Sequence, residues 1–369
     1  MSGRRRPMRV LLVIGSARMG GAEGQLTRLA CELAQRGLDV RVLFTGGDGP
    51  LTARLDAAGV PWQVLRRYPA PSSTLATLAM PVRLARLLVT WQPDVVFAWL
   101  AAAVWLTLPM TAALTRAKRI AAFRGEVFDR DLRWFARPFR AAVSRAHAVT
   151  VNSPSLRAEA IRWGADPDRV TFVPNGVDRP AGTADVAPSP PTAVVVANFR
   201  WYKGHDVLVD ALALVDEPVT VRLVGEGSER EATRARAVER GVADRLHFVD
   251  HPADVAAELR GAQFAIHPSR TEGLSNAILE ELAAGLPVVA TDVGGTSLLV
   301  ADGVNGFLVP AGDEHQLAKR ISELAASARL RATMSVAART RSATYDWDAC
   351  TDSYLRLFQD LVTPARSRS

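Results

Sequence analysis

The stretch HPSRTEGLSNAILEELAAG, residues 267–285, runs from the end of an apolar segment into a helical one. Its glutamates Glu272 and Glu280 lie eight positions apart, and Gly273 and Ser275 stand where a strand should give way to a helix. A helix that begins near Ser275 directs its unpaired backbone N–H groups, and the positive end of its dipole, at the preceding loop. Such a helix end binds phosphate groups. The stretch therefore predicts an α/β domain with a diphosphate site at a strand end.

The two glutamates suit different parts of a nucleotide ligand. Glu280 falls in the second turn of the expected helix, where its carboxylate could accept two hydrogen bonds from a ribose diol. Glu272 precedes the helix, where it could accept hydrogen bonds from sugar hydroxyls. The alternative is that Glu280 and Glu281 are surface residues of an ordinary helix and that Gly273 is only a turn.

Short β-branched segments alternate with helical segments on both sides of this stretch. Strands are predicted over residues 9–14, 39–44, 62–65, 94–98, 119–123, 148–151 and 171–173, and again over residues 192–197, 219–224, 246–249, 263–267, 287–290 and 307–309. Alternation of this kind builds parallel sheets with helices on both faces. The prediction is two doubly wound, Rossmann-like α/β domains that face a central cleft. Ligands of such sheets bind at the carboxyl ends of the strands, so this cleft is the expected site.

Residues 179–191 interrupt the alternation with four prolines and little apolar content, which is typical of a linker. The expected division is an N-terminal domain over 1–179, a Pro-rich linker over 180–191 and a C-terminal domain over 192–345. A helix is expected over 346–369, packing back toward the N-terminal domain.

The composition excludes several classes of protein. Of 369 residues, 48% are hydrophobic, 22% charged and 7% aromatic, which is ordinary for globular proteins and excludes disordered, collagen-like and disulfide-rich chains. Only two cysteines occur, Cys31 and Cys350, without a CxxC motif or a Cys/His cluster. The histidines are not spaced as metal ligands, and no Asp-x-Asp motif occurs. We therefore expect no metal site, and two unpaired cysteines fit the reducing cytoplasm.

Residues 95–115 contain no charged side chain and are long enough to span a bilayer. The segment opens in a strand-like piece and contains Pro109. It also lies between other strand and helix signals. A buried strand followed by a buried helix is the better interpretation, so the chain is predicted to be soluble.

Charge is divided unequally between the two halves. Residues 1–179 hold 26 Lys and Arg against 13 Asp and Glu, whereas the remainder holds 19 against 25. The basic half suits an anionic membrane, an acidic acceptor or nucleic acid, or it is simply an arginine-rich solvated surface. Residues 131–145 interleave arginines with Trp134, Phe135 and Phe139. This segment either rests on anionic lipid or is a domain helix with its aromatic side chains in the core. No nucleic-acid-binding motif accompanies it.

Two more segments after predicted strands carry groups suited to phosphate binding. Arg200 and Lys203 lie between a strand and a helix, where both could direct positive charge at a nucleotide diphosphate. The alternative is that they are an ordinary exposed Arg–Lys pair after a strand. Gly225 and Gly227 form a short turn that lets backbone approach a nucleotide closely, or is merely a strand-end turn.

A third segment of this kind follows the first predicted strand. Gly20 and Gly21 lie there, where a helix opens, and form a turn suited to phosphate. The G-x-G-x-x-G spacing of a dinucleotide fingerprint is absent.

Residues 267–285 resemble the Glu-x7-Glu donor signature of retaining glycosyltransferases of the GT-B fold, specifically glycosyltransferase family 4. The resemblance continues through residues 285–295 and 302–310 and covers nearly the whole second half. There are two departures. The family usually has an Arg where Asn198 stands, so Arg200 takes that role from a shifted position. It often has a strand-end His where Arg124 stands, and a guanidinium cannot act as a base.

The resemblance implies roles for particular residues. Lys203 and Arg200 stabilise the leaving diphosphate, Glu272 contacts the donor sugar, Glu280 holds the ribose, and Arg124 contacts an acidic acceptor or the donor phosphate. The remaining donor-binding residues that it implies are Gly20, Gly21, Gly225, Gly227, Gly273, Leu274 and Ser275.

The implied activity is retaining transfer of a sugar from a UDP- or GDP-sugar to a hydroxyl acceptor, without metal or other cofactor. The family suggests a lipid-linked or polysaccharide acceptor, a cytoplasmic enzyme on the inner face of the plasma membrane, and membrane contact through the basic half. The alternatives are a GT-B-like nucleotide-sugar epimerase and a non-catalytic protein that binds sugar nucleotides or nucleic acid. Nucleic acid is the least favoured partner.

Overall fold

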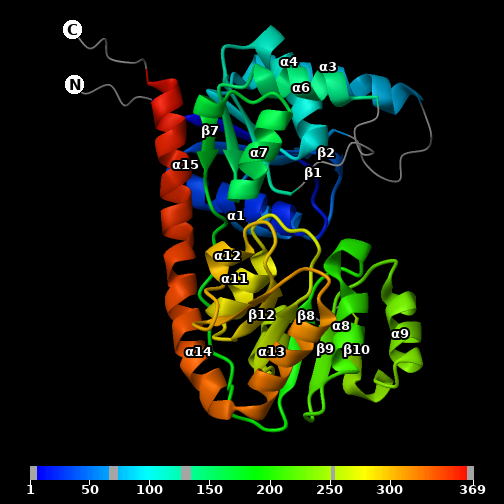
Figure 1. The fold of residues 1–369 in the computed structure, drawn as a ribbon. Helices are drawn as coiled ribbons and strands as arrows, with labels where there is room; N and C mark the ends of the chain where they lie inside the picture. The colour runs from blue at the N-terminus through cyan, green and yellow to red at the C-terminus, as the bar shows by residue number, and fades with distance from the viewer. Residues whose placement is uncertain (1–5, 66–73, 126–133, 251–253, 364–369) are drawn as a thin grey trace. The chain divides into compact units, whose positions relative to one another are not determined.

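The computed structural model describes residues 6–65, 74–125, 134–250 and 254–363. The chain folds into two compact units and crosses between them twice (Figure 1). Unit 1 comprises Met1–Gly176 together with Trp347–Ser369, and unit 2 comprises Val177–Asp346.

Unit 1 is built on a seven-stranded parallel sheet with strand order β3-β2-β1-β4-β5-β6-β7. Its strands are β1 (Arg9–Ser16), β2 (Asp39–Gly47), β3 (Trp62–Val64), β4 (Val95–Trp99), β5 (Lys118–Phe123), β6 (Ala148–Val151) and β7 (Val170–Phe172). These are the strands predicted for the first half, with ends displaced by up to three residues. Side chains of β1 alternate between two cores, because successive side chains of a strand point to opposite faces of the sheet. Because the strands are apolar along nearly their whole length, both faces of the sheet must be covered.

Helices cover both faces of this sheet. Side chains of α3 (Thr74–Trp91), α4 (Ala101–Leu114), α6 (Ala136–Ser144) and α7 (Pro154–Arg162) pack into one core. Side chains of α1 (Gly21–Gln35), α2 (Thr52–Ala57) and α15 (Trp347–Val362) pack into the other. The uncharged segment 95–115 forms β4 and α4, as predicted. Among the described residues, no helix combines the length and the apolar character needed to cross a bilayer.

Unit 2 is built on a six-stranded parallel sheet with strand order β10-β9-β8-β11-β12-β13. Its strands are β8 (Thr192–Val196), β9 (Thr220–Val224), β10 (Leu246–Val249), β11 (Phe264–His267), β12 (Val288–Thr291) and β13 (Gly306–Val309). Its helices are η2 (Trp201–Lys203), α8 (His205–Leu212), α9 (Arg230–Glu239), α10 (Val255–Arg260), α11 (Asn276–Ala283), α12 (Thr296–Leu299), α13 (Glu314–Ala326) and α14 (Ala328–Ser342). Cores lie on both faces of this sheet too. The predicted fold class of two doubly wound parallel-sheet domains is confirmed.

The Pro-rich segment 180–191 differs from the expected linker, because it packs onto unit 2. Ala184 and Val186 are buried in the core of that unit. The fully buried guanidinium of Arg331 donates hydrogen bonds to the carbonyls of Val186 at 2.8 Å and Pro188 at 2.7 Å. The prolines prevent helix or strand here, but their extended backbone offers carbonyl groups that Arg331 satisfies.

The C-terminal helix α15 belongs to unit 1, although the chain reaches it from unit 2. Tyr354 and Phe358 pack against Phe97 of β4, with ring centroids 5.5 and 5.8 Å apart. Close to the crossing points, Gly176 lies against the indole of Trp347, and a Cβ on that glycine would come within 2.6 Å of the ring. Strand β1 and helix α15, which are far apart in the sequence, therefore contribute side chains to one core.

Candidate functional site

The strand order of unit 2 brings two distant loops together. The chain runs from β8 to β9 and β10 on one side, and then returns to β11 on the other side of β8. The carboxyl ends of β8 and β11 therefore flank the point where the strand order reverses, which is where ligands bind in open parallel sheets. The loop after β8 carries Arg200 and Lys203, and the loop after β11 carries Glu272.

Lys203 and Glu272 form an ion pair across this point. Lys203 Nζ lies 2.5 Å from Glu272 Oε1, and their side chains are only 17% and 10% exposed. The hydroxyl of Ser269 donates a second hydrogen bond to the same carboxylate oxygen at 2.8 Å. Residues 69 positions apart in sequence, which the sequence analysis assigned to one ligand, thus lie in contact.

Gly204 allows the two loops to approach each other. Its φ is +69°, a conformation that favours glycine, and a Cβ there would lie 1.9 Å from the carbonyl oxygen of Pro268. Arg270 also joins the two loops, because its backbone N–H donates a hydrogen bond to the carbonyl of Tyr202 at 2.7 Å. Its guanidinium donates to both carboxylate oxygens of Asp206, at 2.9 and 2.6 Å.

The Arg270–Asp206 pair is a structural feature that the sequence analysis missed. Burial acts to raise the pKa of the Asp206 carboxyl, but the hydrogen bonds and charge of Arg270 outweigh it and lower that pKa. Arg270 lies within residues 267–285, but its partner Asp206 follows η2, and no spacing rule joins the two.

Gly225 and Gly227 are needed for a contact within unit 2. Their φ angles are +146° and +150°, and Cβ atoms there would lie 2.2 Å from the carbonyl oxygen of Ala197 and 2.3 Å from that of Phe199. The two glycines thus let their own turn lie against the loop after β8, which also carries Lys203. Contact of either glycine with a nucleotide stays a prediction.

Helix α11 begins where the sequence predicts. Ser275 is its N-cap, and the Ser275 hydroxyl accepts a hydrogen bond from the backbone N–H of Ile278 at 3.4 Å. Gly273, Leu274 and Ser275 are buried, whereas Glu280 is exposed on the second turn. The arrangement keeps the positive end of the α11 dipole beside the loop that holds Glu272.

A buried pair that no sequence pattern predicts joins the end of β11 to helix α11. His267, the last residue of β11, places Nε2 2.8 Å from both carboxylate oxygens of Glu281 on α11. The side chains are 3% and 0% exposed. Burial raises the pKa of Glu281, and the charge and hydrogen bond of His267 oppose that effect.

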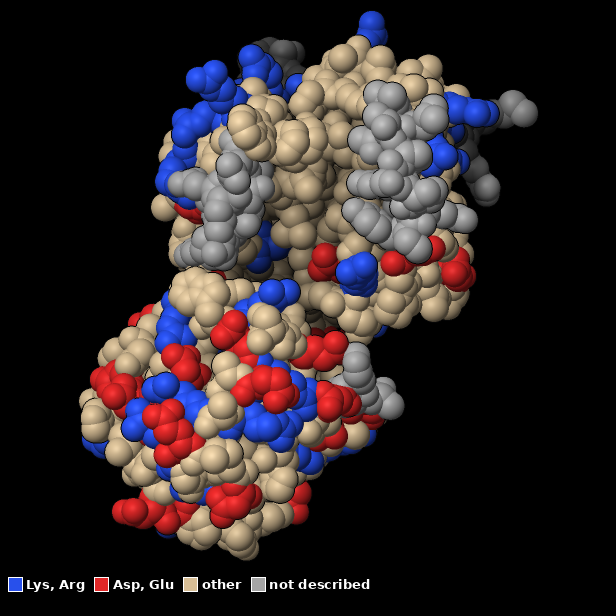
Figure 2. All heavy atoms as spheres, turned by 90° about the vertical axis from the view of Figure 1, so that its right-hand side faces the viewer, with Lys and Arg blue, Asp and Glu red and all other residues tan. Residues whose placement is uncertain are grey.

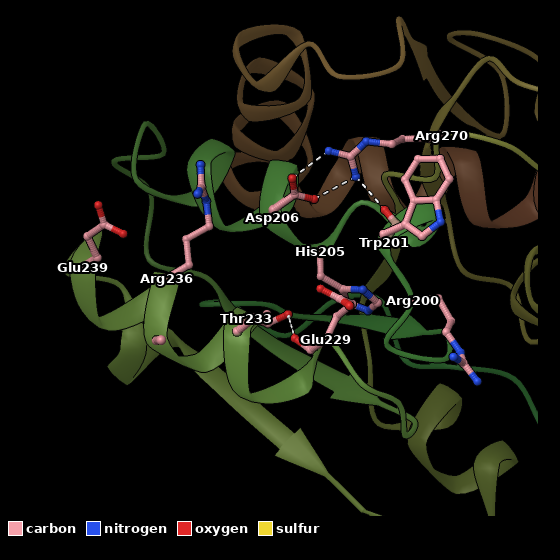
Figure 3. Close-up of a pocket in the computed structure, with 11 residues that line it drawn as sticks. Arg200, Trp201, His205, Asp206, Glu229, Thr233, Arg236, Glu239 and Arg270 are labelled. Carbon is pink, nitrogen blue, oxygen red and sulfur yellow. Dashed lines mark hydrogen bonds and ion pairs between the residues drawn. The ribbon is translucent and has the colours of Figure 1, made fainter.

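Arg200 lines a cavity of about 550 Å³ (Figure 3), and neither Lys203 nor Glu272 is among the residues that line it. The cavity also opens beside Trp201 and Asp206 and is bounded by α9. His205 lines it too, but is 3% exposed, and neither ring nitrogen has a hydrogen-bond partner. Burial, with a smaller effect of the Lys203 charge, lowers the pKa of His205 to about 4, so its ring is neutral at pH 7.

Arg124, predicted to contact the acceptor or the donor phosphate, is held by groups of unit 1. Its guanidinium lies over the Trp99 ring, 4.1 Å from the centroid. It donates to the carbonyl of Val173 at 3.2 Å and to the hydroxyl of Tyr354 on α15. These contacts tie the end of β5 to the C-terminal helix, a connection that sequence spacing cannot reveal. The ligand-binding role of Arg124 stays a prediction.

Gly20 and Gly21 lie in unit 1, at the start of α1. Gly20 is the extended N-cap residue, and a Cβ on it would come within 2.3 Å of the carboxylate of Glu23. Burial raises the pKa of Glu23. Within the part of the chain that the structure describes, no three His, Cys, Asp or Glu side chains gather as metal ligands.

Comparison with protein families assigns both halves of the chain. Residues 19–179 match the model described as glycosyltransferase family 4, and residues 190–327 match the model described as glycosyl transferases group 1. The two matches together cover most of both units. They confirm the family resemblance predicted from residues 267–285.

Curated relatives include D-inositol 3-phosphate glycosyltransferases from several bacteria and a lipopolysaccharide core biosynthesis glycosyltransferase from Rhizobium meliloti. The protein of Jonesia denitrificans is 33% identical in an alignment that covers 53% of this chain and 52% of that protein. The protein of Saccharomonospora viridis is 29% identical in an alignment that covers 95% of this chain and 92% of that protein. The chain spans about half the length of the first relatives it matches.

A solved structure shares the fold of the whole chain. It is that of the Anabaena protein HepE in complex with UDP, which superposes with a TM-score of 0.83 at 22% identity and covers 96% of this chain and 100% of that one. Another structure of HepE contains UDP-glucose and has the same TM-score, 0.83. The likeness shows that the order of strands and helices described above recurs in a protein that binds UDP.

Proposed function

Because this chain belongs to the glycosyl transferases of group 1, the GT-B glycosyltransferases of family 4, we propose that it transfers a sugar from a UDP- or GDP-sugar to a hydroxyl acceptor. The observation that carries the proposal is the Lys203–Glu272 pair at the point where the strand order of unit 2 reverses. A cation and a carboxylate held there fit the two ends of a sugar diphosphate. The nucleotide ligands of HepE support this donor class.

In the proposed reaction, charge that develops on the leaving diphosphate is stabilised by Lys203 and by the N–H groups at the start of α11. Glu272 accepts hydrogen bonds from the donor sugar and Glu280 from the ribose. Arg200 is exposed and can turn toward the phosphates, where its guanidinium adds a second positive charge. The attack occurs on the face that the diphosphate leaves, so the anomeric configuration is retained and a phosphate oxygen receives the acceptor proton. These fixed positive groups serve in place of a metal ion.

Two rival functions predict different products, and one experiment separates all three. The protein is incubated with UDP-glucose, UDP-N-acetylglucosamine or GDP-mannose, with and without a bacterial lipid extract as acceptor, and the products are followed by proton NMR. A transferase releases nucleoside diphosphate in an acceptor-dependent manner and forms a product of unchanged anomeric configuration. An epimerase alters the donor without an acceptor. A binding protein broadens donor signals and changes nothing, which contradicts the proposal.

The ribose assignment is tested by Glu280→Ala. The variant should bind the free nucleoside diphosphate on the order of tenfold more weakly, because two hydrogen bonds to a carboxylate are lost. The fold should be unaffected, since the side chain is exposed. Isothermal titration with the diphosphate measures the change. Wild-type affinity in Glu280→Ala means that another group holds the ribose.

We also propose that unit 1 rests on the inner face of an anionic membrane, where it meets a lipid-linked or polysaccharide acceptor. Trp134 is 82% exposed beside the start of α6, and Phe135, 42% exposed, stacks on Trp105 of α4 with ring centroids 4.2 Å apart. Phe139 alone of the three predicted aromatic side chains is buried in the core. Two of the three thus expose part of their rings to solvent, and a headgroup layer could cover those exposed parts.

The charge around these aromatic side chains favours an anionic surface. Residues 95–125 and 134–158 contain Lys and Arg but no Asp or Glu, whereas the sequence between them, residues 126–133, contains three acidic and two arginine residues. On the face drawn in Figure 2, unit 1 presents large uncharged areas with Lys and Arg around its upper part and a few acidic side chains along its lower part, whereas unit 2 presents many acidic and basic side chains intermingled. A basic surface with exposed aromatic side chains is attracted to anionic lipid and buries apolar area in it.

Vesicle binding tests this surface. The protein should sediment with vesicles that contain phosphatidylglycerol, less so at high salt, and not with pure phosphatidylcholine. Trp134→Ala should weaken binding on the order of tenfold, because a large apolar side chain no longer enters the interface. Trp201→Ala is the matched control, since Trp201 is 51% exposed but belongs to unit 2. Equal effects of the two substitutions, or equal binding to both lipids, exclude this surface.

A further inference from the structure

The pair formed by His267 and Glu281 is unusual because both members are buried and one is a carboxylate with no exposure to solvent. A buried charged or polar group is costly unless it is fully hydrogen-bonded, and apolar residues of similar size are often equally stable. The pair therefore requires an explanation other than stability alone. Its position, between the end of β11 and helix α11, suggests one.

Glu281 follows directly after Glu280 on α11. Successive residues of a helix are separated by about 100° around its axis, so the direction of one fixes the direction of the next. Burying Glu281 against His267 leaves Glu280 exposed on the adjoining face. The apolar side chains of α11, such as Ile278 and Leu282, also face the core, but apolar packing is non-directional. The hydrogen bonds of Glu281 have a defined direction and so set the rotation of the helix.

His267 also lies at the root of the loop that carries Glu272. Its carbonyl accepts a hydrogen bond from the hydroxyl of Thr291 at 3.4 Å, and the carbonyl of Ser269 accepts one from the same hydroxyl at 2.5 Å. Ser269 in turn donates to Glu272. A continuous set of hydrogen bonds thus joins the ends of β11 and β12 to Glu272, and the His267–Glu281 pair extends it to α11.

We propose that His267 and Glu281 are positioning residues, which orient α11 and the loop over residues 268–275 so that the α11 N-terminus and Glu280 meet the nucleotide donor. This inference rests on the proposed function, because it names how that donor site is held in shape. Neither residue touches the donor; both act through α11 and the loop. The pair should therefore matter for donor binding more than for the turnover of bound donor.

Three variants separate positioning from stability. Glu281→Gln retains a hydrogen bond to His267 and should stay within about threefold of the wild-type KM for the donor. Glu281→Leu leaves His267 without its hydrogen-bond partner. The double variant His267→Phe/Glu281→Leu replaces the whole pair by apolar side chains, and buried ion-pair sites often tolerate such a replacement without loss of stability. The double variant should stay folded, with a KM raised on the order of tenfold or more and a smaller change in kcat. A wild-type KM in the double variant overturns the proposal.

Hydrogen exchange keeps this test separate from the test of the proposed function. Without any ligand, the backbone amides of Ile278 and Leu279 should exchange faster in the double variant than in the wild type, while the melting temperature is similar. Unchanged exchange at these amides overturns the positioning role even if the wild type binds no nucleotide. If wild-type protein binds no nucleoside diphosphate but exchange at α11 responds as expected, the proposed function fails and the positioning of α11 stands.

Discussion

Replacing Lys203 by alanine is expected to slow sugar transfer on the order of 100-fold or more. The Lys203 ammonium, on a side chain only 17% exposed, pairs with Glu272 at the strand ends of unit 2, and the proposed leaving group carries the charge that it stabilises. Removing a preorganised group that acts on developing charge typically costs this much in turnover. Nucleoside diphosphate release, measured with saturating donor and acceptor, reports the change.

Two further variants show whether the effect belongs to Lys203 itself. Lys203→Arg keeps the charge with a different shape and should retain part of the activity, because a guanidinium fits the compact lysine site poorly. Arg200→Ala removes an exposed cation three residues earlier and should slow transfer less than Lys203→Ala does. Turnover by Lys203→Ala equal to that of the wild type contradicts the role given to Lys203.

The second large effect is expected for Gly204→Ala, which should destabilise unit 2 by about 3 kcal/mol or more. The new Cβ would lie 1.9 Å from the carbonyl oxygen of Pro268, in a backbone conformation that disfavours alanine. Relief requires the loops after β8 and β11 to separate. The ion pair between Lys203 and Glu272 spans the same two loops and should be lost with them. Urea unfolding followed by circular dichroism measures the loss of stability.

Gly241→Ala is the matched control for this substitution. Gly241 has the same φ of +69°, but a Cβ there meets no atom within 4 Å. The free energy of unfolding of the control should therefore fall by only about 1–2 kcal/mol, which is the cost of the left-handed backbone conformation for alanine. If both substitutions destabilise equally, the close approach of the two loops contributes nothing, and the explanation of Gly204 is wrong.

The sequence predicts the fold of this chain well because the signal for parallel sheets is local. Each buried strand appears as a short β-branched run, and all thirteen predicted strands occur in the structure. The start of α11 was also predictable, since Ser275 is a common N-cap residue. The prediction of the strands and that of the start of α11 each depend on a pattern within a few consecutive residues.

Contacts between distant residues were predictable only where a family motif names both partners. Lys203 and Glu272 were assigned to one ligand and lie in contact. By contrast, the pairing of His267 with Glu281 and that of Arg270 with Asp206 depend on how helices and loops meet in space. Charged residues in those positions are ordinary in a sequence, and only the structure distinguishes a buried carboxylate from a surface one.

The Pro-rich segment 180–191 and Arg124 show the same limit in another form. Prolines exclude regular secondary structure, which suggested a linker, but they do not exclude packing, and Arg331 satisfies the carbonyls of the segment. Arg124 is a charged residue at a strand end, which is typical of a ligand-binding group. Its side chain nevertheless contacts Trp99 and Tyr354, and Tyr354 lies 230 positions away in the sequence. Residue type alone does not separate these roles.

The most direct test of the central claim, a nucleoside diphosphate site in unit 2, is ligand-dependent thermal stability. Wild-type protein and Glu280→Ala are melted with UDP, GDP or ADP, first in EDTA and then with Mg²⁺. A ligand at 100 times its dissociation constant adds about 2.7 kcal/mol, which raises the melting temperature measurably. We predict that one nucleoside diphosphate stabilises the wild type in EDTA and stabilises Glu280→Ala less. Stabilisation only with Mg²⁺ contradicts metal-free binding, and no stabilisation by any of the three contradicts the site itself.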